Sequence, residues 1–531
     1  MTDSTATLHD VAPHPLDNSS SKITNVLLAV VILAGAGWAA SQLIADLDVV
    51  HTSSVLPYLL LGIALSIALG FEFVNGFHDT ANAVATVIYT HSLPANFAVV
   101  WSGTWNLIGV LASSGAVAFT IVSLLPVELI LQVGSSAGFA MVFALLIAAI
   151  IWNLGTWWLG LPASSSHTLI GSVIGVGLMN QLMCGPNGTS GVDWGQATKI
   201  GYSLLASPLF GFVLAGGLLW LMKTFIHIPA LYKAPTGNKP PPFAIRGLLV
   251  LTCTLVSFFH GSNDGQKGMG LIMLILIGTV PTAYALNRSM HEDQIQTFVA
   301  MSDRASTMLS HYAEGPAPAD IRAEVTRYVR THDLTPETVP AVQSLTKDIR
   351  DQVAAYQSIS KIPPETVGNV RNDMYLSGEA LRIMKKAGKP AMAAEDQLAI
   401  DAYHKQIDNA TKFIPTWVKV AVAVALGMGT MIGWKRIVVT VGEKIGKSHL
   451  TYGQGAAAEL IAASVIGAAD GLGLPVSTTH VLSSGVAGTM MANGSGLQWS
   501  TVRNLAMAWV LTLPVAIALS GSLFWIFRHT F

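Results

Sequence analysis

Charged residues are scarce in this chain. Asp, Glu, Lys and Arg make up 11% of its 531 residues, whereas about a quarter of the residues of a soluble globular protein are charged. Hydrophobic residues make up 51%, and the mean hydropathy is +0.53. The formal net charge is only −1 and no basic patch stands out, which argues against nucleic acid as a partner. The composition excludes an ordinary soluble domain and predicts an all-α protein that crosses a membrane several times.

Cysteine is almost absent as well. Cys184 and Cys253 each lie in or beside an apolar segment, and neither has a CxxC or histidine-rich neighbourhood. A disulfide framework, a tightly bound metal and a resident cofactor are therefore not expected.

Several apolar runs are long enough to cross about 30 Å of hydrocarbon as helices, and we count roughly ten to twelve. The first run, residues 24–46, follows a polar segment, residues 1–23, that we expect to be disordered. A secretory signal peptide is the alternative interpretation. The run is long for a signal, and Trp38-Ala39-Ala40 is a poor cleavage site, which favours a retained transmembrane helix.

Two short motifs occur twice, which indicates an internal repeat. Residues 75–85 read NGFHDTANAVA and residues 260–270 read HGSNDGQKGMG, at an offset of 185. Residues 159–168 read LGLPASSSHT and residues 472–481 read LGLPVSTTHV, at an offset of 313. The two offsets differ by 128 residues, so one inserted segment in the second copy would reconcile them.

A charged stretch, residues 286–412, has almost this length. It holds 15 of the 29 Lys and Arg residues and 17 of the 30 Asp and Glu residues. Apolar residues at helical spacing predict helices over 318–332, 338–360 and 366–387, separated by prolines. The sequence therefore predicts two homologous membrane halves with re-entrant or broken helices, and a soluble helical insert in the second half.

The predicted organisation has seven parts along the chain. They are a disordered tail (1–23), an extra transmembrane helix and loop (24–54), the first membrane repeat (55–223), a polar basic loop (224–246), the first part of the second repeat (247–285), the insert (286–412) and the rest of the second repeat (413–531).

Two basic loops, residues 223–246 and 435–447, constrain the topology. The positive-inside rule places both in the cytoplasm. Three apolar stretches lie between them, near 247–264, 268–286 and 413–433, and an odd number of crossings conflicts with that placement. We therefore predict that the first stretch, which contains the HGSND sequence, is re-entrant and lines a cavity.

The motifs LPASSSH and LPVSTTH are typical of helix starts. Pro162 and Pro475 suit the first turn of a helix, and three hydroxyl residues follow each of them. The free backbone N–H groups of such a start carry partial positive charge and can hold a phosphate. The alternative is that the serines only cap the helices. Occurrence in both copies favours an anion site built from broken helices at mid-membrane.

Asp79 and Asp264 lie in apolar surroundings, where an unpartnered carboxylate costs at least about 2.5–3.5 kcal/mol. Carboxylates repel phosphate, so we expect them to serve a cation: a proton, Na⁺, or a divalent metal that travels with the phosphate. Asn82, Asn263 and Gln266 offer neutral oxygen ligands that suit hard cations. The alternative is that each aspartate caps its own helix break.

Five further polar residues lie in apolar segments. Lys267 can pair with the aspartate three residues earlier, contact phosphate, or extend to the membrane interface. His167 and His480 end the hydroxyl runs and can donate to phosphate, relay a proton, or pack between helices. Glu459 invites the same interpretation as the aspartates, and Asn106 is expected to hydrogen-bond between helices.

Taken together, these motifs resemble the signatures of the Pit-type inorganic phosphate transporters, in particular the bacterial low-affinity, proton-coupled carriers. The resemblance covers about residues 55–531, with the motifs in the same order. It implies an inverted repeat with phosphate between the halves, and a homodimer in the lipid of the bacterial inner membrane. The residues expected to contact phosphate are Ser164, Ser165, Thr168, Asn82, Ser477, Thr478, Thr479, Asn263, Gln266 and Lys267. Those expected to couple a proton or another cation are Asp79, Asp264, Glu459, His167 and His480.

The predicted function is secondary active import of inorganic phosphate, and of arsenate, in symport with protons. The phosphate would travel as a neutral complex with a divalent metal such as Mg²⁺. His78 stands where many family members have asparagine and Asn106 where many have glutamate, which argues against sodium ligation. A sodium-coupled phosphate symporter and a sulfate permease of the same family are the alternatives. An enzyme is not expected, because a hydrolytic triad of Ser164, His167 and Asp79 would lack a nucleophile elbow.

Overall fold

Helices make up all the regular structure in the part of the chain that the computed structural model describes, which is residues 22–47, 56–125, 136–184, 191–235, 239–288, 290–356 and 359–530. Most of the tail and loop predicted at 1–23 and 48–54 lies outside these residues. The membrane-type helices are α1 (Lys22–Leu47), α2 (Leu56–Asp79), α3 (Ala81–Tyr89), α4 (Ala95–Ala112), α5 (Ala116–Val122), α7 (Ser136–Trp158), α8 (Ser165–Cys184), α9 (Trp194–Phe225), α10 (Phe243–Thr279), α11 (Pro281–Tyr284), α17 (Thr416–Thr430), α18 (Lys435–Glu443), α19 (Tyr452–Gly471), α20 (Thr478–Asn493) and α21 (Trp499–Thr530). Between α11 and α17 come α12 (Glu292–Ser310), α13 (Ile321–Thr331), α14 (Thr338–Tyr356), α15 (Pro364–Ala387) and α16 (Ala394–Thr411).

Fewer of the described helices have the length and apolarity of a membrane span than the sequence suggested. Within the described residues, seven helices are long and apolar enough to cross, or eight if α16 and α17, which meet at a bend of 70°, form one span. Several of the ten to twelve apolar segments counted in the sequence form helices too short to meet this criterion. Among these, α3 has 9 residues, α5 has 7 and α18 has 9.

The predicted re-entrant stretch at 247–264 is wrong. Residues Phe243–Thr279 form one continuous helix of 37 residues, α10, which includes the whole HGSNDGQKG sequence. The polar residues of that sequence are tolerated because they face other helices and not lipid: every residue from His260 to Ile277 is buried. Since 247–264 and 268–286 lie largely on one helix, the three apolar stretches between the basic loops form two helices, α10 and α17. Two crossings, one by each helix, would agree with the positive-inside rule.

The helices pack in reciprocal pairs that place the repeated motifs side by side. Helix α4 packs on α10 and α17 on α2, while α9 packs on α20 and α21 on α8. Close approach depends on glycine: a Cβ at Gly261 of α10 would lie 2.1 Å from the Asn106 carbonyl oxygen of α4. A Cβ at Gly76 of α2 would lie 2.3 Å from the Leu426 carbonyl oxygen of α17. Small residues at such crossings are common where membrane helices meet.

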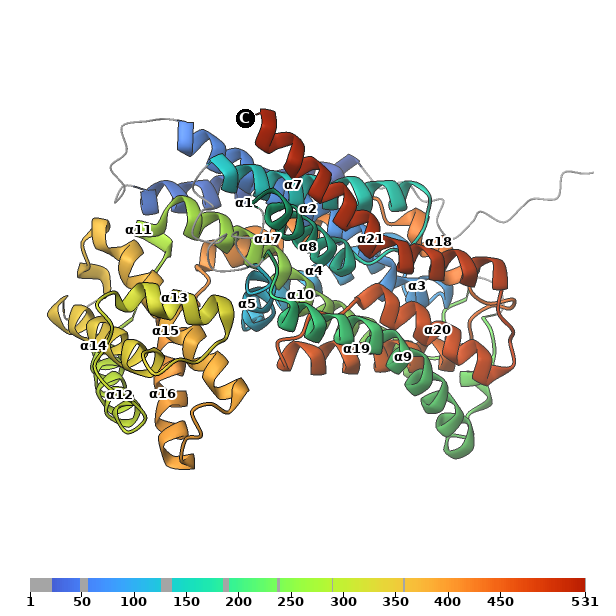
Figure 1. Ribbon diagram of the computed structural model, residues 1–531. Helices are drawn as coiled ribbons and strands as arrows, with labels where there is room; N and C mark the ends of the chain where they lie inside the picture. The colour runs from blue at the N-terminus through green and yellow to red at the C-terminus, as the bar shows by residue number, and fades with distance from the viewer. Residues whose placement is uncertain are drawn as a thin grey trace, which may run out of the picture.

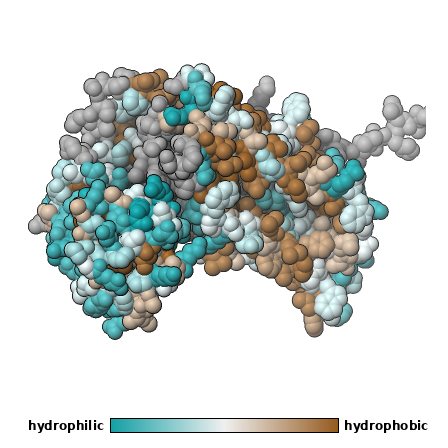
Figure 2. Space-filling model, viewed as in Figure 1, coloured by the Kyte–Doolittle hydropathy of each residue, from teal (hydrophilic) through white to brown (hydrophobic). Residues whose placement is uncertain are grey.

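Helices α12 to α16 form a bundle at the lower left of Figure 1, with an apolar core of their own. The helices predicted at 318–332, 338–360 and 366–387 correspond to α13, α14 and α15. Figure 2 shows that this bundle has a mostly hydrophilic surface, whereas brown, hydrophobic side chains dominate the middle of the molecule. The ion pair between Arg382 of α15 and Asp193, the residue that caps α9, joins the bundle to the membrane helices at 3.2 Å.

The carboxylate of Glu324 in this bundle should make the stability of α13 depend on pH. Its hydrogen bonds with Arg327 lower its pKa from 4.5 to about 2, and Thr338 and Thr335 contribute. A carboxylate with a lowered pKa stabilises the fold above its unfolded pKa, and that stability is lost as the pH falls toward 2. We expect Glu324→Gln to destabilise α13 by about 1–2 kcal/mol at pH 7, and by less at pH 3. Hydrogen exchange of α13 in the full chain, compared with wild type at each pH, measures this; an equal effect at both values would contradict it.

Candidate functional site

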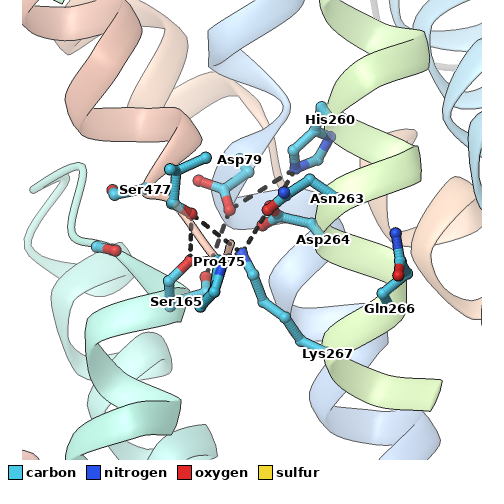
Figure 3. Close-up of polar contacts among 12 residues, drawn as sticks. Asp79, Ser165, His260, Asn263, Asp264, Gln266, Lys267, Pro475 and Ser477 are labelled. Carbon is cyan, nitrogen blue, oxygen red and sulfur yellow. Dashed lines mark hydrogen bonds and ion pairs between the residues drawn. The ribbon is translucent and has the colours of Figure 1, made fainter. Parts of the chain in front are cut away.

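The repeated motifs meet in the interior of the membrane part. Asp79 ends α2, the HGSNDGQKG sequence lies in the middle of α10, and the two hydroxyl-rich motifs form the starts of α8 and α20 (Figure 3). The sequence positions of these elements are far apart, and their close packing is what brings the motifs together. We call Asp79, Ser165, Ser166, His260, Asp264, Lys267 and Thr479 the central cluster; each of these side chains is buried.

Both hydroxyl motifs start helices, as predicted. The Ser164 hydroxyl accepts from the His167 backbone N–H at 3.1 Å, and the Ser477 hydroxyl accepts from the His480 N–H at 3.2 Å. These two serines therefore cap α8 and α20. The Thr168 hydroxyl donates back to the Ser164 carbonyl at 2.9 Å. The hydroxyls that contact the central cluster belong to Ser165 and Ser166, which follow Ser164, and to Thr479, two residues after Ser477.

Asp79 joins the two hydroxyl motifs. The Thr479 hydroxyl donates to Asp79 Oδ1, and the Ser165 hydroxyl lies 3.4 Å from Asp79 Oδ2. One carboxylate of the first repeat is thus in contact with the helix start of each copy. The helix N-termini and the hydroxyl donors stabilise a negative charge at this position.

Lys267 is the buried cation of the cluster. Its ammonium donates to Asp264 Oδ1 at 2.6 Å and to the Ser166 hydroxyl, and lies 3.4 Å from the Val476 carbonyl oxygen. The i, i+3 pairing with Asp264 was one of the three interpretations that the sequence left open. The structure excludes extension to the membrane interface, because the side chain is fully buried. A buried charge of this kind requires partners such as these.

His260 is the residue that sequence reasoning missed. Its Nε2 lies 3.8 Å from Asp79 Oδ2 and 3.6 Å from Asp264 Oδ2, between the two carboxylates. Its Nδ1 donates to Asn106 Oδ1 at 2.9 Å, and Asn106 Nδ2 donates to the Thr430 hydroxyl at 3.0 Å. Asn106 thus connects helices, as expected. A signal was available, since His260 opens the second copy of the motif, but the first copy has asparagine there.

His167 and His480 face each other across the two copies. Their ring centroids are 4.6 Å apart, and the His480 ring also stacks on Trp509 at 4.2 Å. His167 Nδ1 lies 2.8 Å from the Ser164 hydroxyl. The two rings therefore pack against each other in the first turns of α8 and α20.

Some predicted residues lie away from the central cluster. Gln266 is on the other side of α10 in Figure 3 and donates to Asp470 Oδ1 at 2.6 Å. Glu459 of α19 accepts from the hydroxyls of Thr86 and Thr252. Asn263 donates to the Leu474 carbonyl at 3.1 Å, just before the second hydroxyl motif.

Thr478 and Asn82 are the remaining residues predicted to contact phosphate. Thr478 is the first residue of α20 and is buried. Asn82 belongs to α3, but its side chain lies outside the described part of the molecule.

The cluster combines groups for an anion with groups for a cation. One ligand atom each from Asp79, His260 and Asp264 lies within 4.8 Å of the others, a spacing that suits one cation. Next to them, the Lys267 ammonium, several hydroxyls and two helix starts supply donors for an anion. Neighbouring sites of opposite sign suit a substrate that carries both charges.

Comparison with known proteins gives concordant matches. Residues 75–520 match the model of the phosphate transporter family. The chain is 43% identical to the low-affinity inorganic phosphate transporter PitA of Escherichia coli strain K12 over 506 residues, which are 91% of this chain and 99% of that protein. It is 28% identical to the probable low-affinity inorganic phosphate transporter of Bacillus subtilis strain 168, with 87% of this chain and 96% of that protein covered. A solved sodium-dependent phosphate transporter is similar at 20% identity and a TM-score of 0.49, over 89% of this chain and all of that one, which is too distant to indicate the coupling ion.

Proposed function

This chain belongs to the phosphate transporter family, and on that premise we propose that it imports inorganic phosphate in symport with protons. It is a multi-pass protein of the bacterial inner membrane. Its relatives are named as transporters, and we propose no enzymatic activity for it. The main observation in support of this proposal is that the side chains of Asp79, Asp264 and Lys267 lie together at the starts of α8 and α20.

We assign phosphate to the donor side of the cluster. Ser165, Ser166, Thr479 and Lys267 supply hydroxyl and ammonium donors, and the helix starts add partial positive charge. Arsenate has the same charge and tetrahedral shape and would bind in the same way. In this arrangement the ammonium of Lys267 would exchange part of its contact with Asp264 for contact with the anion.

We assign the carboxylates of Asp79 and Asp264 to the binding of a cation. Asp79 and Asp264, with His260 between them, would hold a divalent metal such as Mg²⁺ that enters with phosphate as a neutral complex. Neutralising both partners reduces the cost of moving them through a low-dielectric interior. The metal is cargo in this scheme.

We further propose that the two membrane halves are an inverted repeat and that residues 286–412 are a soluble insert. The reciprocal packing of α4 on α10 and α17 on α2 supports the repeat. The hydrophilic surface and separate core of α12 to α16 support the insert. Family likeness favours a homodimer in the lipid bilayer.

The side of the membrane on which the insert lies can be tested. Because α10 crosses once from the cytoplasmic basic loop, the insert should be periplasmic, and long domains translocate despite their charge. We expect a cysteine at exposed Glu314 to react with a membrane-impermeant maleimide in cells with a permeabilised outer membrane. A cysteine at exposed Lys444 should react only after the inner membrane is opened. The opposite pattern would reverse the topology.

The function itself is tested by uptake of radiolabelled phosphate into proteoliposomes. We expect accumulation to follow a pH gradient, to ignore a Na⁺ gradient, and to increase with Mg²⁺. If a Na⁺ gradient drove accumulation, phosphate would remain the substrate, but the coupling ion would be Na⁺ and not the proton. Accumulation of sulfate without phosphate would overturn the substrate.

A further inference from the structure

Glu72 of α2 is a buried carboxylate that the central cluster does not use. It lies seven residues before Asp79, so it is on nearly the same face of the helix and about 10 Å from it along the axis. Its side chain is fully buried, and neither carboxylate oxygen has a hydrogen-bond partner in the described part of the chain. An ionised carboxylate without donors in such a place is strongly disfavoured.

Glu72 is packed directly against the segment that carries Lys267. A Cβ at Gly268 would lie 2.3 Å from Glu72 Cγ and 2.5 Å from Glu72 Oε1, so the carboxylate rests on the bare backbone of α10. Gly268 follows Lys267 in the chain. The ammonium of Lys267 now points to Asp264 and Ser166, and its backbone is joined directly to Gly268, on which Glu72 packs.

The charged groups around Glu72 are few. His260, Asp264 and Lys267 of α10 act on it, whereas α3 and α7 contain no charged residue. On α17 the one charged residue, Lys419, donates to the Ser113 carbonyl at 2.8 Å. Lys267 and His260 are therefore the two groups of α10 near Glu72 that can carry positive charge, and Lys267 is next in the chain to Gly268, against which Glu72 packs.

We propose that Glu72 is the residue that binds and releases the co-transported proton, and that Lys267 is its partner when it is ionised. This rests on the proposed function, proton-coupled phosphate transport. In the arrangement seen here Glu72 holds the proton, and Lys267 stays with Asp264 and the phosphate side. When water reaches Glu72 on the inside, the proton passes to water and the carboxylate attracts the Lys267 ammonium. Phosphate then loses its strongest donor and leaves.

Glu72→Gln tests this, because glutamine keeps the shape of a protonated glutamate. With the membrane potential held at zero, a gradient of about one pH unit sustains up to about tenfold accumulation for one proton per phosphate. We expect Glu72→Gln to lose that accumulation while it still exchanges phosphate between equal concentrations on the two sides. Glu443→Gln on α18, where the carboxylate bonds to Tyr89, is the matched control and should keep both.

A second measurement does not depend on transport. The infrared carbonyl band of a protonated carboxylic acid should be present in the folded wild type and lose intensity in Glu72→Gln. Unchanged accumulation in the variant, equal loss of exchange and accumulation, or no such band would each overturn the assignment. If wild-type phosphate uptake itself ignores the pH gradient, the proposed coupling fails for the whole carrier, and the role of Glu72 with it.

Discussion

Asp264→Asn should abolish phosphate accumulation and destabilise the protein by about 3–5 kcal/mol, the usual cost of removing one partner of a buried ion pair. Asp264 is the carboxylate bound to Lys267, at 2.6 Å, and both side chains are almost completely buried. Asparagine would remove the negative charge that balances the ammonium and leave it with neutral partners, such as the Ser166 hydroxyl and the Val476 carbonyl. Thermal unfolding in detergent and uptake in proteoliposomes measure the two effects.

A double variant separates stability from transport. Asp264→Asn with Lys267→Met removes both charges, so we expect it to recover most of the stability of wild type. It should remain inactive, because Lys267 and Asp264 would both be missing from the proposed site. Asp401→Asn is the matched control: its pair with Lys385 lies on the surface of the bundle, and its loss should cost less than about 1 kcal/mol. A double variant that transports would refute the assigned roles.

The repeat made the position of the site predictable, and its asymmetry made part of it unpredictable. Asp79 and Asp264 align in the two motifs, and so do the hydroxyl runs, so these residues could be assigned to one site from self-similarity alone. His260 has no histidine counterpart in the first copy, where Asn75 stands. Its place between the carboxylates follows from the packing of α10 on α2 and α4, which no local pattern encodes.

The sequence also failed to predict that α10 is one continuous helix. Glycine and asparagine are unfavourable within a lipid-facing helix, and the HGSNDGQKG sequence therefore favoured a break. In the structure the glycines of this sequence face α4 and α2, where small side chains allow close packing, and Asn263 donates to the Leu474 carbonyl. The first copy does break, at Thr80 between α2 and α3, so the two copies differ in backbone although their sequences align. By contrast, the charged helices α13 to α15 followed the ordinary apolar period and their proline boundaries, and were predicted closely.

Gly261→Ala should have the opposite effect from the same substitution elsewhere in α10. Alanine normally stabilises a helix by about 0.5–1 kcal/mol relative to glycine, and Gly247→Ala, with no heavy atom within 4 Å of the added Cβ, should be neutral or stabilising. At Gly261 the Cβ would lie 2.1 Å from the Asn106 carbonyl oxygen, so α4 and α10 must move apart. We expect a loss of about 1–3 kcal/mol in stability, as for other overpacked contacts.

Transport should suffer more than stability does, because Gly261 lies three residues before Asp264 and Asn106 holds His260. A displacement of about 1 Å at a positioned group can reduce a rate about 100-fold, and we expect a loss of that order. Gly76→Ala should behave in the same way, since Gly76 contacts α17 and precedes Asp79 by three residues. The matched control in α2 is Gly70→Ala, where the added Cβ would again meet no heavy atom within 4 Å. If both crossing variants transported like their controls, close approach of these helices would not be what positions the two aspartates.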